Sequence, residues 1–197
     1  MSYIKILFFI YISKYNKNII NKNMEIIKKI WEDVFEKSLT YSISEISEKY
    51  LKPLGLEAIY IEQQFTENES NFFGVYIRSL NLLKDGKIAF SINRDKLFSE
   101  MKRLGYIKEK NTRMQVHILT YHEIGHGLID FIKNMKFTED EMKTLPYTKT
   151  LLSEKDDEKL AYDFGRSAEK QKTFQYDSVL EKSLYEILEL INKRETP

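Results

Sequence analysis

The sequence predicts an α+β fold in which a small, mostly antiparallel sheet of three or more strands packs on helices. Two changes of hydrophobic period indicate it. Apolar residues recur at helical spacing after Met24 and again from about residue 111, whereas between these segments they alternate at every second position. Alternation leaves one face of a strand polar, as in an antiparallel sheet with one solvated side. The chain of 197 residues contains no repeat or low-complexity linker, so we expect a single domain.

The N-terminal part of the chain has a different composition from the rest. Residues 3–12 form the one strongly apolar run, and an Asn- and Lys-rich stretch separates it from Met24. The run is far shorter than the roughly 20 residues that cross a bilayer, and no small-residue cleavage site follows it. We therefore expect residues 1–23 to be an extension, residues 24–197 to be the domain, and the protein to be cytoplasmic. Membrane association or export through residues 3–12 is the alternative.

The first helix is expected to begin near Met24. Its apolar stripe consists of Ile27, Ile30, Trp31, Val34 and Phe35. Residues 38–42 predict a break in this stripe, and Pro53 with Gly55 predicts its end.

Three alternating runs follow, at residues 59–65, 73–77 and 87–93. Asp85-Gly86 is typical of a two-residue hairpin turn, so the second and third runs are expected to pair antiparallel. Further helices are expected at residues 97–104, ended by Gly105, at about 111–133, and after three capping patterns. These patterns are Thr138–Glu141, Ser153–Asp156 and Ser178–Glu181.

The helix expected at residues 111–133 contains the motif His122-Glu123-Ile124-Gly125-His126. Residues four apart on a helix lie above one another on one face, so the two imidazoles can bind one tetrahedral Zn²⁺. Glu123 points about 100° away around the helix, where it can act as the general base for a metal-activated water. Two ordinary packed or exposed histidines are the alternative. It is disfavoured because the chain has only three histidines and because polar groups in a buried helix need partners.

A catalytic zinc needs a third protein ligand and one open position. The chain has no cysteine and no histidine after His126, and His117 lies about 140° around the helix from His122, so the third ligand must be a carboxylate. Asp130 is too far along the motif helix to close the ligand set with both histidines. The downstream acids are Glu139, Asp140, Glu141, Glu154, Asp156, Asp157, Glu158 and Asp163. Glu158 is favoured because Ala161 and Gly165 share its face and would let its helix approach the motif helix, with Glu154 or Asp157 as fallback.

His-Glu-x-Gly-His followed about thirty residues later by Glu158-x-x-Ala161-x-x-Phe164-Gly165 resembles the compact gluzincins of the ImmA/IrrE type, which are bacterial and phage metallopeptidases. The resemblance extends in layout over about Leu56–Gly165. It implies a zincin-like fold with one Zn²⁺ per chain, His122, His126 and Glu158 as ligands, and Glu123 as base. Such proteins commonly have Asn directly after the Ala, where this chain has Tyr162. One turn beyond Glu158, Tyr162 is the favoured oxyanion donor, ahead of Tyr121 and His117.

The expected function is therefore zinc-dependent endoproteolysis, and the resemblance suggests limited cleavage of a regulatory protein. A membrane-associated gluzincin and a non-catalytic zinc-containing binding module are the alternatives. Lys and Arg number 31 against 30 Asp and Glu, and no basic cluster is evident, so nucleic acid is not an expected partner. The expected partner is a protein or peptide substrate, and the sequence does not indicate the oligomeric state. Lys87–Asn93, the run with the cleanest alternation, is expected to be the sheet edge that borders the zinc and binds substrate.

Overall fold

The computed structural model describes residues 3–63, 65, 71–168 and 178–195. Eight α-helices and three strands form an α+β fold within these residues. The first helix, α1 (Tyr3–Ile46), continues into a π-helical turn at Ser47–Leu51 and a 3-10 turn at Lys52–Leu54. Gly55 ends this segment with a φ of 69°, as the Pro-Gly signal predicted.

Helix α1 differs from the prediction at two places. It begins before Met24 rather than at it, and it passes through residues 38–42 without a break. The hydroxyl groups of Ser38 and Ser42 donate hydrogen bonds to the main-chain carbonyls of Val34 and Ser38, at 2.5 and 2.7 Å. These serines therefore point back into their own helix, a conformation that their polarity alone does not distinguish from a break.

The sheet contains β1 (Glu57–Tyr60), β2 (Gly74–Ile77) and β3 (Lys87–Ile92) in the order β1-β3-β2. Strand β3 pairs antiparallel with β2, which confirms that prediction, but it pairs parallel with β1. The sheet is thus mixed, and the expectation of a mostly antiparallel sheet is wrong.

The expectation that Lys87–Asn93 is a sheet edge is also wrong, because β3 is the central strand. All its residues except Lys87 are buried, including Ala89 and Ser91 on the face that the alternation marked as solvated. In the sequence, Ala89 and Ser91 are compatible with a solvated face, but a small residue and a hydroxyl also fit a buried face. The edge strand next to β3 on the antiparallel side is β2.

Asp85-Gly86 does not form a two-residue hairpin loop. Helix α2 (Leu80–Lys84), capped by the Ser79 side chain, lies between β2 and β3. Asp85 and Gly86 end this helix, and Gly86 adopts a φ of 72° before the chain enters β3.

The later helices follow the predicted pattern closely. Helix α3 (Arg94–Arg103) precedes Gly105, whose φ is 70°, and α4 (Glu109–Asn134) contains the whole motif segment. The Thr138–Glu141 capping box opens α5 (Glu139–Thr144), and α6 (Pro146–Ser153) follows. Asp156, not Ser153, caps α7 (Asp157–Ser167). The Ser178 hydroxyl accepts a hydrogen bond from the main-chain N–H of Glu181 in α8 (Val179–Glu195).

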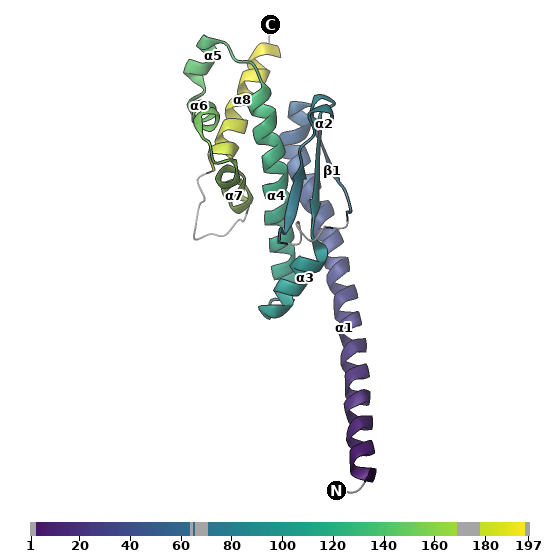
Figure 1. Cartoon of the computed structure of the whole chain (residues 1–197). Coiled ribbons are helices and arrows are strands. Elements are labelled where there is room, and N and C mark those ends of the chain that lie inside the picture. Colours follow the sequence, from purple (N-terminus) through teal and green to yellow (C-terminus); the bar gives the residue numbers. More distant parts are fainter. Residues whose placement is uncertain (1–2, 64, 66–70, 169–177, 196–197) are drawn as a thin grey trace.

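Helix α4 is the central element of the fold (Figure 1). It lies between the sheet and α1 on one side and α5–α8 on the other. Its residues Ile124, Leu128, Ile129 and Ile132 are fully buried. None of the helices in the described part of the chain is both long and apolar enough to span a bilayer.

Candidate metal centre

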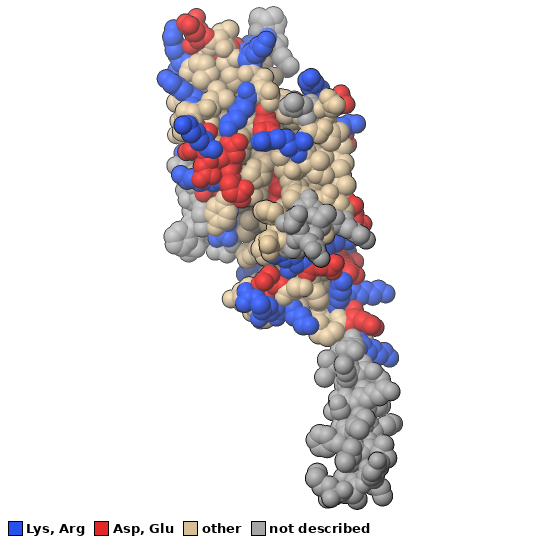
Figure 2. All heavy atoms as spheres, viewed as in Figure 1, with Lys and Arg blue, Asp and Glu red and all other residues tan. Residues whose placement is uncertain are grey.

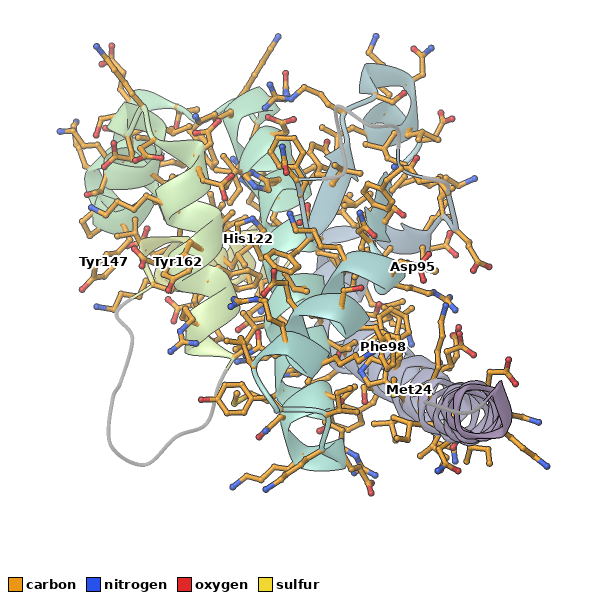
Figure 3. All side chains as sticks on the ribbon, turned by 60° about the horizontal axis from the view of Figure 1, so that its bottom comes forward. Met24, Asp95, Phe98, His122, Tyr147 and Tyr162 are labelled. Atoms are coloured by element: carbon orange, nitrogen blue, oxygen red, sulfur yellow. The ribbon has the colours of Figure 1, made fainter. Side chains whose placement is uncertain are left out.

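The two motif histidines lie one turn apart on α4, as their spacing predicts. The ring centroids of His122 and His126 are 4.9 Å apart and the rings are perpendicular. Figure 3 shows His122 on α4 and Tyr162 on the neighbouring helix α7. The two imidazoles therefore lie at the boundary between the central helix and the helix expected to supply the third donor.

Small residues allow α7 to pack very closely against α4. A Cβ on Gly165 would lie 2.8 Å from the carbonyl oxygen of Ile118 and 3.1 Å from His122 Cβ, and a Cβ on Gly125 would lie 3.5 Å from Ala161 Cα. Any larger side chain at Gly165 would push the two helices apart. The predicted role of Ala161 and Gly165, a close approach of this helix to the motif helix, agrees with this packing.

This approach places Glu158, in the first turn of α7, beside both histidines. Its Oε1 lies 3.2 Å from His122 Nε2, and its Oε2 lies 3.2 Å from His126 Nε2. Two ligands of one tetrahedral zinc, at bond lengths of about 2.0–2.1 Å, are separated by about 3.3 Å. Each imidazole therefore stands at this spacing from one Glu158 oxygen, His122 from Oε1 and His126 from Oε2.

The other acids considered as ligands have different partners. Glu154 accepts hydrogen bonds from the main-chain N–H groups of Lys155 and Asp156, at 2.9 and 3.2 Å. Asp157 forms an ion pair with Lys133, and Asp130 accepts two hydrogen bonds from Arg78. Figure 2 shows acidic side chains gathered over α7 with Lys and Arg around them, but Glu158 is the one that reaches both imidazoles.

Glu123 is 4% exposed and occupies a different position from Glu158. Its Oε1 lies 4.0 Å from His122 Nε2, and its carboxylate faces Gly74 of β2, where a Cβ would lie 2.4 Å from Oε1. Burial, and to a lesser extent the charge of Glu158, raise the pKa of Glu123 to about 8, while a hydrogen bond from the main chain of Tyr76 acts in the opposite direction. A buried carboxyl with a pKa near neutrality is suited to general acid–base catalysis.

Burial also keeps both histidines in the form that binds metals. It is the main cause of the lowered pKa of His122 and of His126, and the charge of the His126 imidazolium lowers the pKa of His122 further. A hydrogen bond to the main-chain carbonyl of Ala161 partly opposes the lowering of the His122 pKa. A hydrogen bond that orients the ring in this way is common for metal-binding histidines.

The remaining residues singled out from the sequence lie around this centre. Tyr162 is 52% exposed on α7, one turn beyond Glu158, and its expected role as oxyanion donor stays a prediction. His117 faces α1 instead, with Nδ1 2.9 Å from the Ser42 hydroxyl and Nε2 3.5 Å from Glu45. The Tyr121 ring lies against His117, with centroids 4.7 Å apart, so both belong to the contact between α1 and α4.

Sequence reasoning missed the contribution of β2. Alternation marked Phe73, Val75 and Ile77 as its apolar face, and the opposite positions are Gly74, Tyr76 and Arg78. These three residues contact or neighbour the motif helix at Glu123, His126 and Asp130. A glycine within a short strand and an arginine directly after it were the available signal.

The described residues contain one group of ligand atoms suited to a metal ion, formed by His122, Glu123 and His126, with all its atoms within 4.8 Å of one another. Glu158 is not a member of this group, but each of its two oxygens lies 3.2 Å from one of the imidazoles, and its side chain is 74% exposed. Comparison of the chain with protein-family models, with curated proteins and with solved structures finds no match.

Proposed function

We propose that the protein is a zinc-dependent metalloendopeptidase in which His122, His126 and Glu158 bind the metal and Glu123 is the general base. The observation that carries the proposal is the pair of 3.2 Å distances from Glu158 to the two imidazoles, with Glu123 left aside and buried. Two imidazoles, one carboxylate and an open position form a typical catalytic zinc site. A purely structural site has no use for a buried base beside an open position.

Bound there, Zn²⁺ would polarise a peptide carbonyl and lower the pKa of water toward neutrality. The Glu123 carboxylate would accept the proton of the attacking water and then donate it to the leaving amine. Burial raises the pKa of Glu123 to about 8, which favours the protonated form that the second step requires. Tyr162 is the proposed donor to the oxyanion, since it follows Glu158 by one turn and is accessible.

The edge of β2 is the proposed binding site for an extended substrate. The Phe73 carbonyl accepts a hydrogen bond from the Asn93 N–H at 2.8 Å, so the main-chain N–H and C=O groups of residues 73, 75 and 77 point toward β3. Main-chain groups alternate in direction along a strand, so those of Gly74 and the carbonyl of Tyr76 face the open edge, whereas the N–H of Tyr76 hydrogen-bonds to Glu123. A peptide paired with this edge would be recognised mainly through its main chain. The substrate on this proposal is a protein or peptide, and the likeness to compact gluzincins suggests a regulatory protein.

The test compares the zinc-loaded wild type with the Glu123→Gln variant on a complex peptide library, with new termini identified by mass spectrometry. We expect the variant to retain about one Zn²⁺ per chain, as metal analysis would show, because the three ligands are unchanged. Cleavage should fall by roughly a hundredfold or more, since the proton transfers are lost. Cleavage by the variant at the wild-type rate, or cleavage that survives metal chelation, would refute the proposal. Zinc binding without any cleavage by the wild type would favour the non-catalytic binding module.

A further inference from the structure

One face of β2 meets one face of α4 at three successive positions. Gly74 lies against Glu123, the Tyr76 ring lies nearly parallel to the His126 ring, and Arg78 binds Asp130. Alternate residues of a strand advance by about 6.6 Å, whereas the helix advances by about 4.5 Å over three residues and about 6 Å over four. Successive residues on this face of the strand therefore lie opposite successive turns of the helix over these three contacts, and the candidate metal site lies between the first and the last of them.

The contact between Arg78 and Asp130 is the best defined of the three. The guanidinium donates two hydrogen bonds to the carboxylate, from Nε to Oδ2 and from Nη2 to Oδ1, each 2.8 Å long. The Asp130 side chain is only 16% exposed. A bidentate pair with one largely buried partner fixes both geometry and orientation, unlike a mobile surface ion pair.

Tyr76 connects this pair to the metal site. Burial first, and then the charge and hydrogen bonding of Asp130, raise the pKa of the Tyr76 hydroxyl to about 12. The Tyr76 and His126 ring centroids are 6.4 Å apart with an angle of 12° between the planes. The main-chain N–H of Tyr76 is the group that hydrogen-bonds to Glu123. One residue thus contacts a proposed metal ligand through its ring and the proposed base through its main chain.

We infer that Tyr76, held by the Arg78–Asp130 pair, is a positioning residue that fixes the His126 ring for metal binding and the Glu123 carboxylate beside it. The inference rests on the metal site of the proposed function but not on peptide cleavage. Loss of Arg78 removes both guanidinium hydrogen bonds to the Asp130 carboxylate. The end of β2 is then no longer fastened to α4, and the orientation of the His126 ring is less restricted.

The test measures metal binding directly. Zn²⁺ affinity is determined by competition with a chelator, and the visible absorption of the Co²⁺-substituted protein reports the geometry of the ligands. The variants are Arg78→Gln, Asp130→Asn and Tyr76→Phe, the last of which removes only the hydroxyl. Arg194→Gln is the control, because Arg194 also joins two helices through a carboxylate: its Nε and Nη2 both donate to Glu141 Oε1, Nε at 2.9 Å, between α8 and α5.

We expect Arg78→Gln and Asp130→Asn each to weaken Zn²⁺ binding by about tenfold, the usual effect of removing a group that orients a metal ligand, and to change the Co²⁺ spectrum. Tyr76→Phe should also weaken Zn²⁺ binding. In the Arg78→Gln/Tyr76→Phe double variant, the fold-loss of Zn²⁺ affinity should be smaller than the product of the two single fold-losses, because both residues act through one chain of contacts. The control should bind like the wild type.

If all three variants keep the wild-type Zn²⁺ affinity and Co²⁺ spectrum, the positioning role of Tyr76 is refuted while the metal site stands. If the wild type binds no Zn²⁺, the metal site is refuted as well. Should Arg78→Gln or Asp130→Asn fail to fold, Tyr76→Phe still decides, since it removes a single oxygen and keeps the ring.

Discussion

The buried carboxyl of Glu123 makes the stability of the metal-free protein depend on pH in a defined direction. Its pKa is raised from an ordinary value of 4.5 to about 8 in the folded chain. Below pH 4.5 the carboxyl is protonated in both the folded and the unfolded state. As the pH rises, the unfolded chain releases this proton first, so the free energy of unfolding falls until about pH 8 and then levels off.

The size of the effect follows from the shift. Each pKa unit corresponds to 1.36 kcal/mol, so the whole shift corresponds to about 5 kcal/mol, of which about 3.5 kcal/mol develops between pH 5 and pH 8. This is a large fraction of the stability of an ordinary domain. The lowered pKa values of His122 and His126 act in the opposite direction, since they destabilise the folded state as the pH falls below about 6.5.

Comparison with Glu123→Gln isolates the carboxyl, because the variant keeps both histidines. Both proteins are stripped of metal and unfolded with urea at intervals of half a pH unit from pH 5 to pH 8.5. We expect the free energy of unfolding of the variant, minus that of the wild type, to increase by about 3.5 kcal/mol between pH 5 and pH 8. In a Glu158→Gln background this increase should be smaller, because the charge of Glu158 is the second cause of the raised pKa of Glu123. A difference that stays constant with pH would refute the account of Glu123 as a carboxyl protonated by its burial.

Three further predictions concern the metal and the packing around it. His122→Ala and His126→Ala should each lose most of the bound Zn²⁺, as metal analysis would show, and stoichiometric zinc in the double variant would exclude the assignment. Gly165→Val should lower the free energy of unfolding by about 1–3 kcal/mol and weaken Zn²⁺ binding, because it separates α7 from α4; unchanged affinity in a chelator competition would contradict this. Proline at Ala89 or at Ser91 should unfold the domain, since both sides of β3 are paired, and a circular dichroism spectrum like that of the wild type would count against the strand order.

Much of the fold could be predicted because its signals are local. The helical period and Gly105 located α3 and α4 to within a few residues, and the capping patterns located the starts of α5 and α8. The strand order could not be predicted in this way. Ala89 and Ser91 are compatible with a solvated face and with a buried one, and only the neighbours of β3 decide between them. Asp85-Gly86 failed as a hairpin signal because the same two residues can equally end a short helix.

For the candidate site, the sequence by itself determined the two imidazoles and the carboxyl between them. A spacing of four residues places two side chains on one face of any α-helix, whatever surrounds it. It also restricted the third donor to a carboxylate, because the chain offers no other ligand after His126. Only the tertiary structure decided which carboxylate approaches both imidazoles, since the contact between α7 and α4 depends on packing across separate elements. The same holds for Gly74, Tyr76 and Arg78, whose relation to the motif exists only where a strand and a helix lie side by side with their repeats in step.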